Sequence, residues 1–411
     1  MNQGANANRP AACLVRHAPY PDLHVRRDAE TLAQAGYDVT VVALRRPGEA
    51  ASEILNGVHV RRLPVEHHRG GLLRYVWEYA AFFVLALLTV AVLHLRRRFR
   101  VVEVDNMPDP LVFAALVPKL TGARVIFYVF DNVPDLLAHE RGLPPDHRTV
   151  RLLALVERLA AAFADRVLVT QETACRVMQA RGTPAAKLSV VLNCPDEALF
   201  PRRRPRPLAP RDGSLRIVTH GAVLKRYGIH RLIEAMPRVA AEVPGARADV
   251  FGSGEYRADL EALAQRLGVA DRVRFRGHVP LAELVASIGA ADVGYVGMQC
   301  DLMLSNKLME YVALGVPAVV ARWSTYEHYF PDDAVNYFSH DSAADLASTI
   351  LAVYRDPAAA RERAERAAEL YGDYRWGVQR QAYLDVYAEL AAPPALTADR
   401  AIDSRTPATT R

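Results

Sequence analysis

Residues 305–317 read SNKLMEYVALGVP, and the rest of the chain is best understood from this stretch. Its middle consists of good helix formers, and Ser305 or Asn306 can cap the start of that helix. Gly315 stands where the glycine after a helix belongs, and Pro317 prevents the helix from continuing. The stretch therefore predicts a loop, a helix and a turn, with a new element after the proline.

That element is AVVA at residues 318–321, a short apolar run that predicts a buried strand. Within the helix, Lys307 and Glu310 lie three residues apart and share one face near the N-terminus. A lysine and free backbone N–H groups at such a place can bind a phosphate, and a carboxylate one turn later can accept hydrogen bonds from a sugar hydroxyl. On spacing alone, an exposed ion pair worth about 0.2–0.5 kcal/mol is the simpler interpretation.

The whole chain is long and mildly basic. With 411 residues it is too long for one hydrophobic core, so we expect two or three domains. Lys and Arg exceed Asp and Glu by 51 − 46 = 5, which fits an acidic substrate or an anionic membrane surface and is too diffuse to indicate nucleic acid. We expect no secretory signal, and we expect reduced thiols because the cysteines show no metal-binding spacing. The cysteines are Cys13, Cys175, Cys194 and Cys300.

Short apolar runs alternate with helix-forming segments along both halves of the chain. Residues 12–15 predict a strand, residues 25–35 a helix and residues 37–44 a second strand, an order typical of a parallel, doubly wound sheet. The alternation restarts after a Pro- and Arg-rich linker. We therefore predict two α/β domains with a cleft between them. The expected boundaries are a disordered N-terminus at 1–10, a first domain at 11–200, a linker at 201–213, a second domain at 214–372, a C-terminal helix at 373–392 and a disordered tail at 393–411.

The most apolar window of the chain runs from Tyr79 to Leu93 without a charge. As a helix it spans roughly 22 Å, which is shorter than a hydrocarbon core of about 30 Å. Four arginines follow it within residues 96–100. The window is either a buried core helix or a helix that lies on the membrane with its arginines on anionic head groups. We favour contact with the membrane surface over a true span.

Four polar loops of the second half follow the carboxyl ends of predicted parallel strands, where ligands bind in such sheets. They supply cations, free N–H groups and one carboxylate around one place, which suits a nucleoside-diphosphate sugar. The loops are residues 220–228, 252–255, 277–280 and 297–306. The candidate donor-binding residues are Gly221, Lys225, Gly252, Gly254, Gly277, Val279, Ser305, Asn306 and Glu310.

In this context the segment from residue 301 to 321 resembles the donor-binding segment of family-4 glycosyltransferases, and the resemblance extends over about residues 12–390. It implies the GT-B fold, in which two Rossmann-like domains hold the active site between them and a last helix crosses back to the first domain. It also implies a retaining transfer. The other matching motifs are HG at 220–221, RYG at 226–228, FGSG at 251–254, FRGHV at 275–279, FDNVPD at 130–135 and YRW at 374–376.

The resemblance assigns roles to particular residues. Glu310 matches the second glutamate of the family's Glu–seven residues–Glu motif, which binds the ribose of the nucleotide. The first glutamate falls at Leu302 and is therefore missing, with Asp301 as the adjacent candidate. Lys307 matches a family lysine near the donor phosphates, and Arg226 or its neighbour Lys225 fills the role of a second cation.

Glycosyl transfer requires stabilisation of a leaving diphosphate and of an oxocarbenium-like centre. The resemblance implies that cations and a helix N-terminus provide this without a bound metal, and the chain contains no Asp-x-Asp sequence that would hold a divalent ion. On the acceptor side, RHAPY at 16–20 replaces the glycine-rich loop that many relatives carry. The candidate catalytic residues are Lys307, Arg226 and Asp131, and the candidate acceptor-side residues are Arg16, His17, Asp22 and Asn106.

Three functions fit these residues. The first is a retaining glycosyltransferase, peripheral on the cytoplasmic face of the plasma membrane, that moves a sugar from a UDP- or GDP-sugar to a lipid-linked or surface-polysaccharide acceptor without a cofactor. The second is a nucleotide-sugar 2-epimerase on the same fold, which the apolar window disfavours because such epimerases are soluble. The third is a non-catalytic nucleotide-sugar-binding component of a polysaccharide-assembly complex, which the missing glutamate keeps open.

Overall fold

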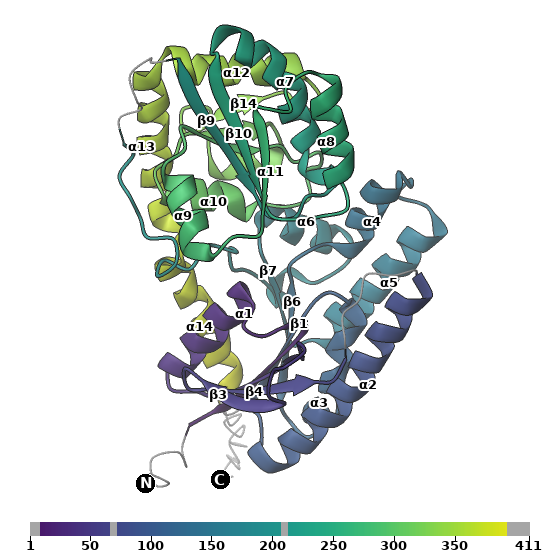
Figure 1. Ribbon diagram of the computed structural model, residues 1–411. Helices are drawn as coiled ribbons and strands as arrows, with labels where there is room; N and C mark the ends of the chain where they lie inside the picture. Colours follow the sequence, from purple (N-terminus) through teal and green to yellow (C-terminus); the bar gives the residue numbers. More distant parts are fainter. Residues whose placement is uncertain (1–8, 66–71, 207–212, 393–411) are drawn as a thin grey trace, which may run out of the picture.

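A computed structural model describes residues 9–65, 72–206 and 213–392 (Figure 1). The expected disordered tail lies outside these residues, as do most of the expected disordered N-terminus and the second half of the linker. The described residues form two α/β domains, one above the other in Figure 1, and a last helix that runs from the upper domain to the lower one.

The first domain is built on an eight-stranded sheet with the order β3-β4-β2-β1-β5-β6-β7-β8. All neighbouring strands are parallel except β3 and β4, which form an antiparallel hairpin at one edge. The strands are β1 (Ala11–Pro19), β2 (Asp38–Leu44), β3 (Ser52–Leu55), β4 (Val58–Leu63), β5 (Val101–Asp105), β6 (Arg124–Val129), β7 (Arg166–Val169) and β8 (Leu188–Val190). The helical segments are α1 (Leu23–Gln34), α2 (Leu72–Arg97), η1 (Asp109–Ala115), α3 (Leu116–Leu120), α4 (Val133–Arg141), α5 (Arg148–Phe163), α6 (Glu172–Ala180) and η2 (Ala185–Lys187).

The second domain contains a six-stranded parallel sheet with the order β11-β10-β9-β12-β13-β14. Its strands are β9 (Ser214–His220), β10 (Gly245–Phe251), β11 (Val273–Gly277), β12 (Val293–Val296), β13 (Ala318–Ala321) and β14 (Asn336–Phe338). Its helical segments are η3 (Lys225–Tyr227), α7 (Ile229–Glu242), α8 (Arg257–Arg266), α9 (Leu281–Gly289), α10 (Asn306–Ala313), α11 (Ser324–Tyr329), α12 (Ala343–Arg355) and α13 (Pro357–Tyr374), and α14 (Trp376–Ala391) follows.

Two doubly wound parallel sheets confirm the predicted fold class. The opening stretch forms α10 followed by β13, as predicted, and Gly315 follows the helix with a φ of +68°. The hairpin strand β3 is not predicted from the sequence, because its exposed edge position leaves only weak alternation. Within the motif at 130–135, helix α4 already begins at Val133.

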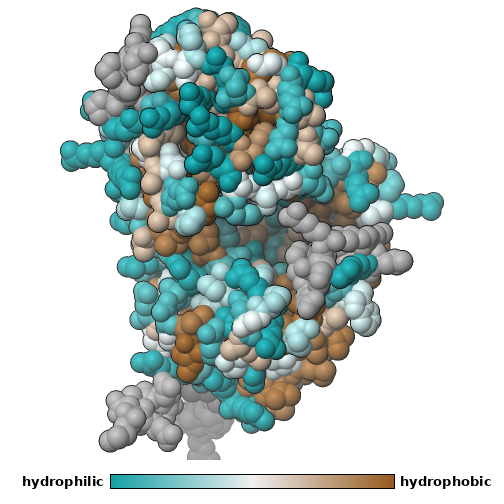
Figure 2. All heavy atoms as spheres, in the orientation of Figure 1, coloured by the Kyte–Doolittle hydropathy of each residue, from teal (hydrophilic) through white to brown (hydrophobic). Residues whose placement is uncertain are grey.

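Helix α2 is longer than the predicted window of residues 79–93. It has 26 residues, so it spans roughly 39 Å, and it is the one helix of the described chain that is long and apolar enough to cross a membrane. One face of the helix packs against the sheet through the buried side chains of Phe82, Ala86 and Val90. Only 22% of its most apolar window is buried, however. One face of the helix is therefore part of the core, and the opposite face is exposed. Figure 2 shows hydrophobic atoms over α2 and α3 at the lower right of the molecule.

The last helix, α14, joins the two domains. Trp376 packs under the guanidinium of Arg27, 3.8 Å from the ring centre, and its indole N–H lies 3.3 Å from the hydroxyl of Thr31. Further along the helix, Tyr383 and a second tyrosine, Tyr387, place their hydroxyls on a buried carboxylate of β5. These contacts fix α14 on the first domain.

Candidate active site

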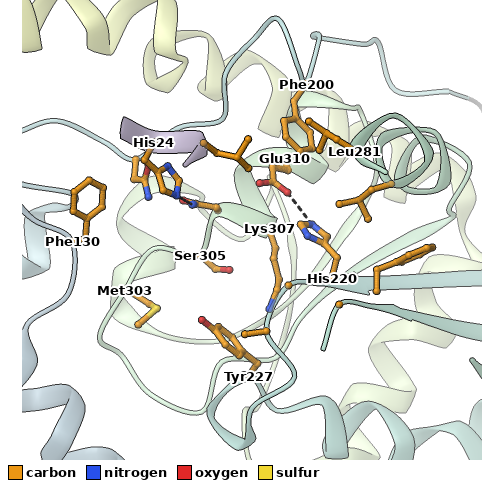
Figure 3. A pocket seen from close by; sticks show the side chains of 18 of the residues that line it. His24, Phe130, Phe200, His220, Tyr227, Leu281, Met303, Ser305, Lys307 and Glu310 are labelled. Carbon is orange, nitrogen blue, oxygen red and sulfur yellow. Dashed lines mark hydrogen bonds and ion pairs between the residues drawn. The ribbon is translucent and has the colours of Figure 1, made fainter. Parts of the chain in front are cut away.

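A cavity of about 470 Å³ lies between the domains, at the carboxyl ends of both sheets (Figure 3). The four loops predicted to converge do converge here, since each contributes lining residues. The predicted site residues that line the cavity are Arg16, Asp131, Gly221, Gly252, Gly277, Val279, Ser305, Asn306, Lys307 and Glu310. Those that lie elsewhere are His17, Asp22, Asn106, Lys225, Arg226 and Gly254.

Helix α10 points its N-terminus into this cavity. Ser305 is its N-cap with an extended backbone (φ −69°, ψ 127°), but its side chain makes no capping hydrogen bond within the helix. The first N–H groups of a helix have no partner in the helix itself. Together with the helix dipole they form a binding place for an anion.

Lys307 extends from the first turn of α10 toward the ring of Tyr227 (Figure 3). Its ammonium nitrogen lies 3.8 Å from the ring centre, in a cation–π contact. A Cβ on Gly221 would lie only 3.2 Å from its Cε atom. The side chain is 8% exposed, and burial lowers the pKa of the amine to about 7. Among the described residues, no carboxylate is within ion-pair distance of this nitrogen.

Glu310 does not pair with Lys307. Its carboxylate instead lies 2.9 Å from Nε2 of His220, at the end of β9 (Figure 3). Both side chains are nearly buried, and the His220 ring meets the Tyr311 ring edge to face, 5.4 Å away. The exposed ion pair that spacing alone favoured is therefore wrong, because the helix buries both groups and directs them to different partners.

The glycines at 252 and 254 differ in what they do. Gly252 has a φ of +108°, and a Cβ there would lie 2.0 Å from the carbonyl oxygen of Gly221. Two cavity loops thus approach each other at a distance that no side chain permits. Gly254 also needs to be glycine, because a Cβ would lie 2.1 Å from the carbonyl oxygen of Val223. It packs against that loop and does not line the cavity.

The second predicted phosphate cation is not in the cavity in this structure. The guanidinium of Arg226 forms an ion pair with Glu140, which lies on α4 of the first domain. Its neighbour Lys225 is exposed. The sequence could not show this, because Glu140 lies in the other domain.

On the acceptor side, Arg16 lines the cavity as predicted. Its guanidinium carbon lies 4.4 Å from the centre of the Phe130 ring, and Nη1 lies 3.6 Å from the carboxylate of Asp105. The next residue, His17, points to the opposite side of β1, because side chains alternate along a strand. Its ring lies 3.2 Å from the Glu78 carboxylate of α2. The assignment of His17 to the acceptor side of the cavity is therefore wrong.

Asp22 and Asn106 support the site from outside it. The carboxylate of Asp22 caps α1 by accepting a hydrogen bond from the N–H of His24 at 3.0 Å. The amide of Asn106 donates to the carbonyl oxygen of Asp131 at 2.7 Å, and its oxygen accepts from the N–H of Phe130 at 2.8 Å. This pair of bonds holds the loop that carries Asp131. Burial raises the pKa of the Asp131 carboxyl, while Arg226 and Arg16 act in the opposite direction.

Asp301 and Leu302 lie where the family's first glutamate would fall. Asp301 does not face the cavity, because its carboxylate accepts hydrogen bonds from Ser324 and from the N–H of Thr325 at the start of α11. The backbone oxygen of Leu302 is bound by the amide of Gln171, from the end of β7, at 2.7 Å. Asp301 therefore does not substitute for the missing carboxylate in this structure.

Several cavity residues were not among the predicted site residues. His24 lies across from α10, with its Nε2 atom 3.3 Å from the amide nitrogen of Asn306. Burial and the charge of Arg27 lower its pKa to about 3, so the ring is neutral. The only feature of the sequence that could have indicated His24 is that it is a polar residue at the start of the helix after the first strand. Thr170, Asn193 and Phe200 also line the cavity and were not predicted. Phe130, His220 and Tyr227 line it too; they belong to the matching motifs but were not among the candidate site residues.

Two family models match this chain, one on each domain. Residues 21–194 match "Glycosyl transferase 4-like domain" and residues 202–370 match "Glycosyl transferases group 1". Together with the two parallel sheets and the cavity between them, these matches identify the chain as a member of the family-4 glycosyltransferases with the GT-B fold. The chain is therefore a glycosyltransferase.

The relatives are enzymes of glycan and glycolipid synthesis. A glycogen synthase from Mycobacterium tuberculosis is 25% identical over 381 residues, which is 89% of this chain and 89% of that protein. The lipopolysaccharide core biosynthesis glycosyltransferase LpsE from Rhizobium meliloti is 33% identical over 43% of this chain and 49% of its own length. A GDP-mannose-dependent phosphatidylinositol monomannoside mannosyltransferase from M. tuberculosis is 31% identical over 39% and 44%.

Solved structures share the fold. Sucrose-phosphate synthase from Thermosynechococcus elongatus superposes with a TM-score of 0.77 at 18% identity, covering 93% of this chain and 99% of that one. HepE from Anabaena, in complex with UDP-glucose, gives a TM-score of 0.69 at 14% identity, with 92% and 99% covered.

Proposed function

We propose that this glycosyltransferase moves a sugar, with retention of anomeric configuration, from a nucleoside-diphosphate sugar to a lipid-linked or surface-polysaccharide acceptor at the cytoplasmic face of the plasma membrane. The observation that carries the donor class is the buried amine of Lys307 at the N-terminus of α10. A buried cation without a carboxylate partner is unfavourable in the empty site. A diphosphate would supply the missing charge, and HepE, a structural neighbour, binds UDP-glucose.

In this proposal the donor binds to the second domain. The diphosphate lies against the N-terminus of α10 and the amine of Lys307, which neutralise the charge that develops as the leaving group departs. The ribose lies within reach of the Glu310 carboxylate, which needs no cation because it is already oriented by His220. The closely packed glycines 221 and 252 allow the nucleotide to approach the backbone.

The acceptor then enters from the first domain, where Arg16, His24 and Asp131 line the facing wall. The partly buried carboxyl of Asp131 has a raised pKa because burial disfavours its charged form, and such a group suits a role in proton transfer. No step of this scheme requires a metal ion or a cofactor.

The membrane location rests on α2 and on the relatives that act on lipids. The exposed face of α2 carries apolar side chains, and arginines follow at its C-terminal end. The mannosyltransferase relative acts on a phosphatidylinositol mannoside by its name. The exposed apolar side of α2 suits the interface with the bilayer, where basic residues meet anionic head groups.

A donor panel tests the proposal. The full chain is incubated with UDP- and GDP-sugars, with and without a membrane extract, and in the presence of a chelator. Transfer of labelled sugar to extract lipids or polysaccharide, with the chelator present, is the expected result. Isomerised donor would indicate the epimerase instead, and nucleotide binding without turnover would indicate a non-catalytic component.

A further inference from the structure

Helix α5 presents an apolar stripe to solvent on the side away from its core contacts. Leu152, Leu155 and Leu159 are 59%, 47% and 53% exposed. At about 100° per residue these three positions share one face. The buried residues of the helix, Val150 and Ala160 among them, lie on the other face. Single exposed leucines are common, but three in one stripe form a patch.

Arginines flank this stripe. Arg148, Arg151 and Arg158 line a groove of about 680 Å³ together with Leu152 and Leu155. Within the described residues, none of these three guanidinium groups has a carboxylate partner. A fourth arginine of the groove, Arg181, is instead held by ion pairs within the first domain. The groove therefore combines free positive charge with exposed apolar surface.

The same combination extends to the neighbouring helices. The helices α2, η1 and α5 pack into one core cluster on one side of the sheet. The only acidic residues in α2, α3 and α5 are Glu78 and Glu157, and both are buried. These three helices therefore expose no carboxylate. The large apolar side chains that they expose include Trp77, Leu88 and Leu95 on α2 and Leu120 on α3.

We propose that the α5 groove is a binding site for an anionic phospholipid surface. The arginines of the groove bind headgroup phosphates, and the leucine stripe enters the boundary with the acyl chains. This inference rests on the proposed membrane location and adds to it a second contact, separate from α2. With both helices on the bilayer, the side of the first domain that carries them lies on the lipid.

A second copy of this chain fits the groove less well than a bilayer. A two-fold contact through α5 would bring the same patch of both copies together, and with it the arginines of both. Like charges with no carboxylates between them repel in such an interface. Lipid phosphates supply the opposite charge that the face lacks.

The test is co-flotation of the full chain with phosphatidylcholine vesicles that contain or lack phosphatidylglycerol. Two double variants probe the groove: Leu152→Ser with Leu155→Ser, and Arg151→Gln with Arg158→Gln. A matched control, Leu267→Ser with Arg274→Gln, changes an exposed leucine and an exposed arginine of the second domain. Trp77→Ser changes an exposed side chain of α2 and measures the contribution of that helix to vesicle binding. Circular dichroism and thermal unfolding establish that each variant is folded.

We expect the wild type to bind phosphatidylglycerol vesicles and each groove variant to bind them at least about tenfold more weakly. The control should bind like the wild type. Groove variants that bind like the wild type would overturn the proposal. A loss of binding in the arginine variant alone would also overturn it, because that result indicates a site for phosphate alone. The same holds if the wild type is a dimer that the leucine variant converts to a monomer with unchanged vesicle binding. Donor hydrolysis without vesicles should be the same in all groove variants as in the wild type. If the wild type itself hydrolyses no donor, that result counts against the proposed function and not against the groove.

Discussion

The ammonium nitrogen of Lys307 lies 3.8 Å from the centre of the Tyr227 ring, at the point where a loop of the second sheet meets the first turn of α10. The aromatic face stabilises the amine in the absence of a carboxylate, but less than a full opposite charge would. The site is therefore prepared for an anion.

Replacement of Lys307 by Met should reduce turnover by about 100-fold or more, because a preorganised cation at a leaving group contributes several kcal/mol to transition-state stabilisation. Steady-state transfer with saturating acceptor measures this effect. Lys119→Met is a suitable control, because Lys119 is paired with Asp165 far from the cavity. Turnover of Lys307→Met close to that of the wild type would remove Lys307 from the mechanism.

Donor binding should weaken as the pH rises above about 7. In the empty site burial holds the pKa of Lys307 at about 7, so the amine is increasingly neutral above this pH. A diphosphate binds the protonated form, so the dissociation constant should rise about tenfold per pH unit and binding should take up a proton. Calorimetry in two buffers of different ionisation enthalpy measures both.

The same pH series in Lys307→Met serves as the reference. Tyr227, His220, Glu310 and Asp131 also face the cavity, and they remain in this variant. A pH dependence that persists unchanged without the lysine would assign it to one of those groups.

The ion pair between Arg226 and Glu140 should compete with the donor. Glu140→Gln releases the guanidinium, which can then turn toward the diphosphate, so the KM for the donor should fall. We expect a decrease of roughly two- to fivefold, because a partly exposed ion pair contributes little free energy. The variant Glu234→Gln, which breaks an ion pair on α7, provides the comparison. An unchanged or higher KM in Glu140→Gln would show that the pair aligns the domains and does not withhold Arg226.

The contact of α14 with the first domain should contribute measurably to stability. The hydroxyls of Tyr383 and Tyr387 lie 3.0 and 3.1 Å from one carboxylate oxygen of Glu103, a buried side chain of β5. Replacing either tyrosine by phenylalanine leaves a buried acceptor with one donor fewer, which costs about 1–3 kcal/mol of unfolding free energy. Urea unfolding measures the loss.

Tyr354→Phe is the control for this series, since Tyr354 is only partly buried and lies in the second domain. The double variant of the two tyrosines should lose more than the sum of the single variants, because only the removal of both hydroxyls leaves the shared buried carboxylate oxygen without either donor. Full additivity would indicate that the two hydroxyls act independently of Glu103.

The order of strands and helices was readable from the sequence because it is a local property. The apolar runs at 12–15 and 37–44 predicted β1 and β2, and Gly315 with Pro317 predicted the end of α10. The donor side of the site was readable for the same reason, since Gly221, Gly252, Ser305 and Lys307 all follow strand ends of one sheet. The acceptor side was not, because only one of its four predicted residues, Arg16, lines the cavity.

The amino-acid sequence was enough to predict two α/β domains and the convergence of the polar loops, because hydrophobic period, turn residues and the succession of strands and helices along the chain are local. The tertiary structure alone decided which partner each charged group meets. Lys307 meets an aromatic ring, Glu310 meets His220, and Arg226 meets a carboxylate from the other domain. Such pairings depend on residues far apart in the chain, and the spacing of Lys307 and Glu310 that suggested an ion pair carries no information about them.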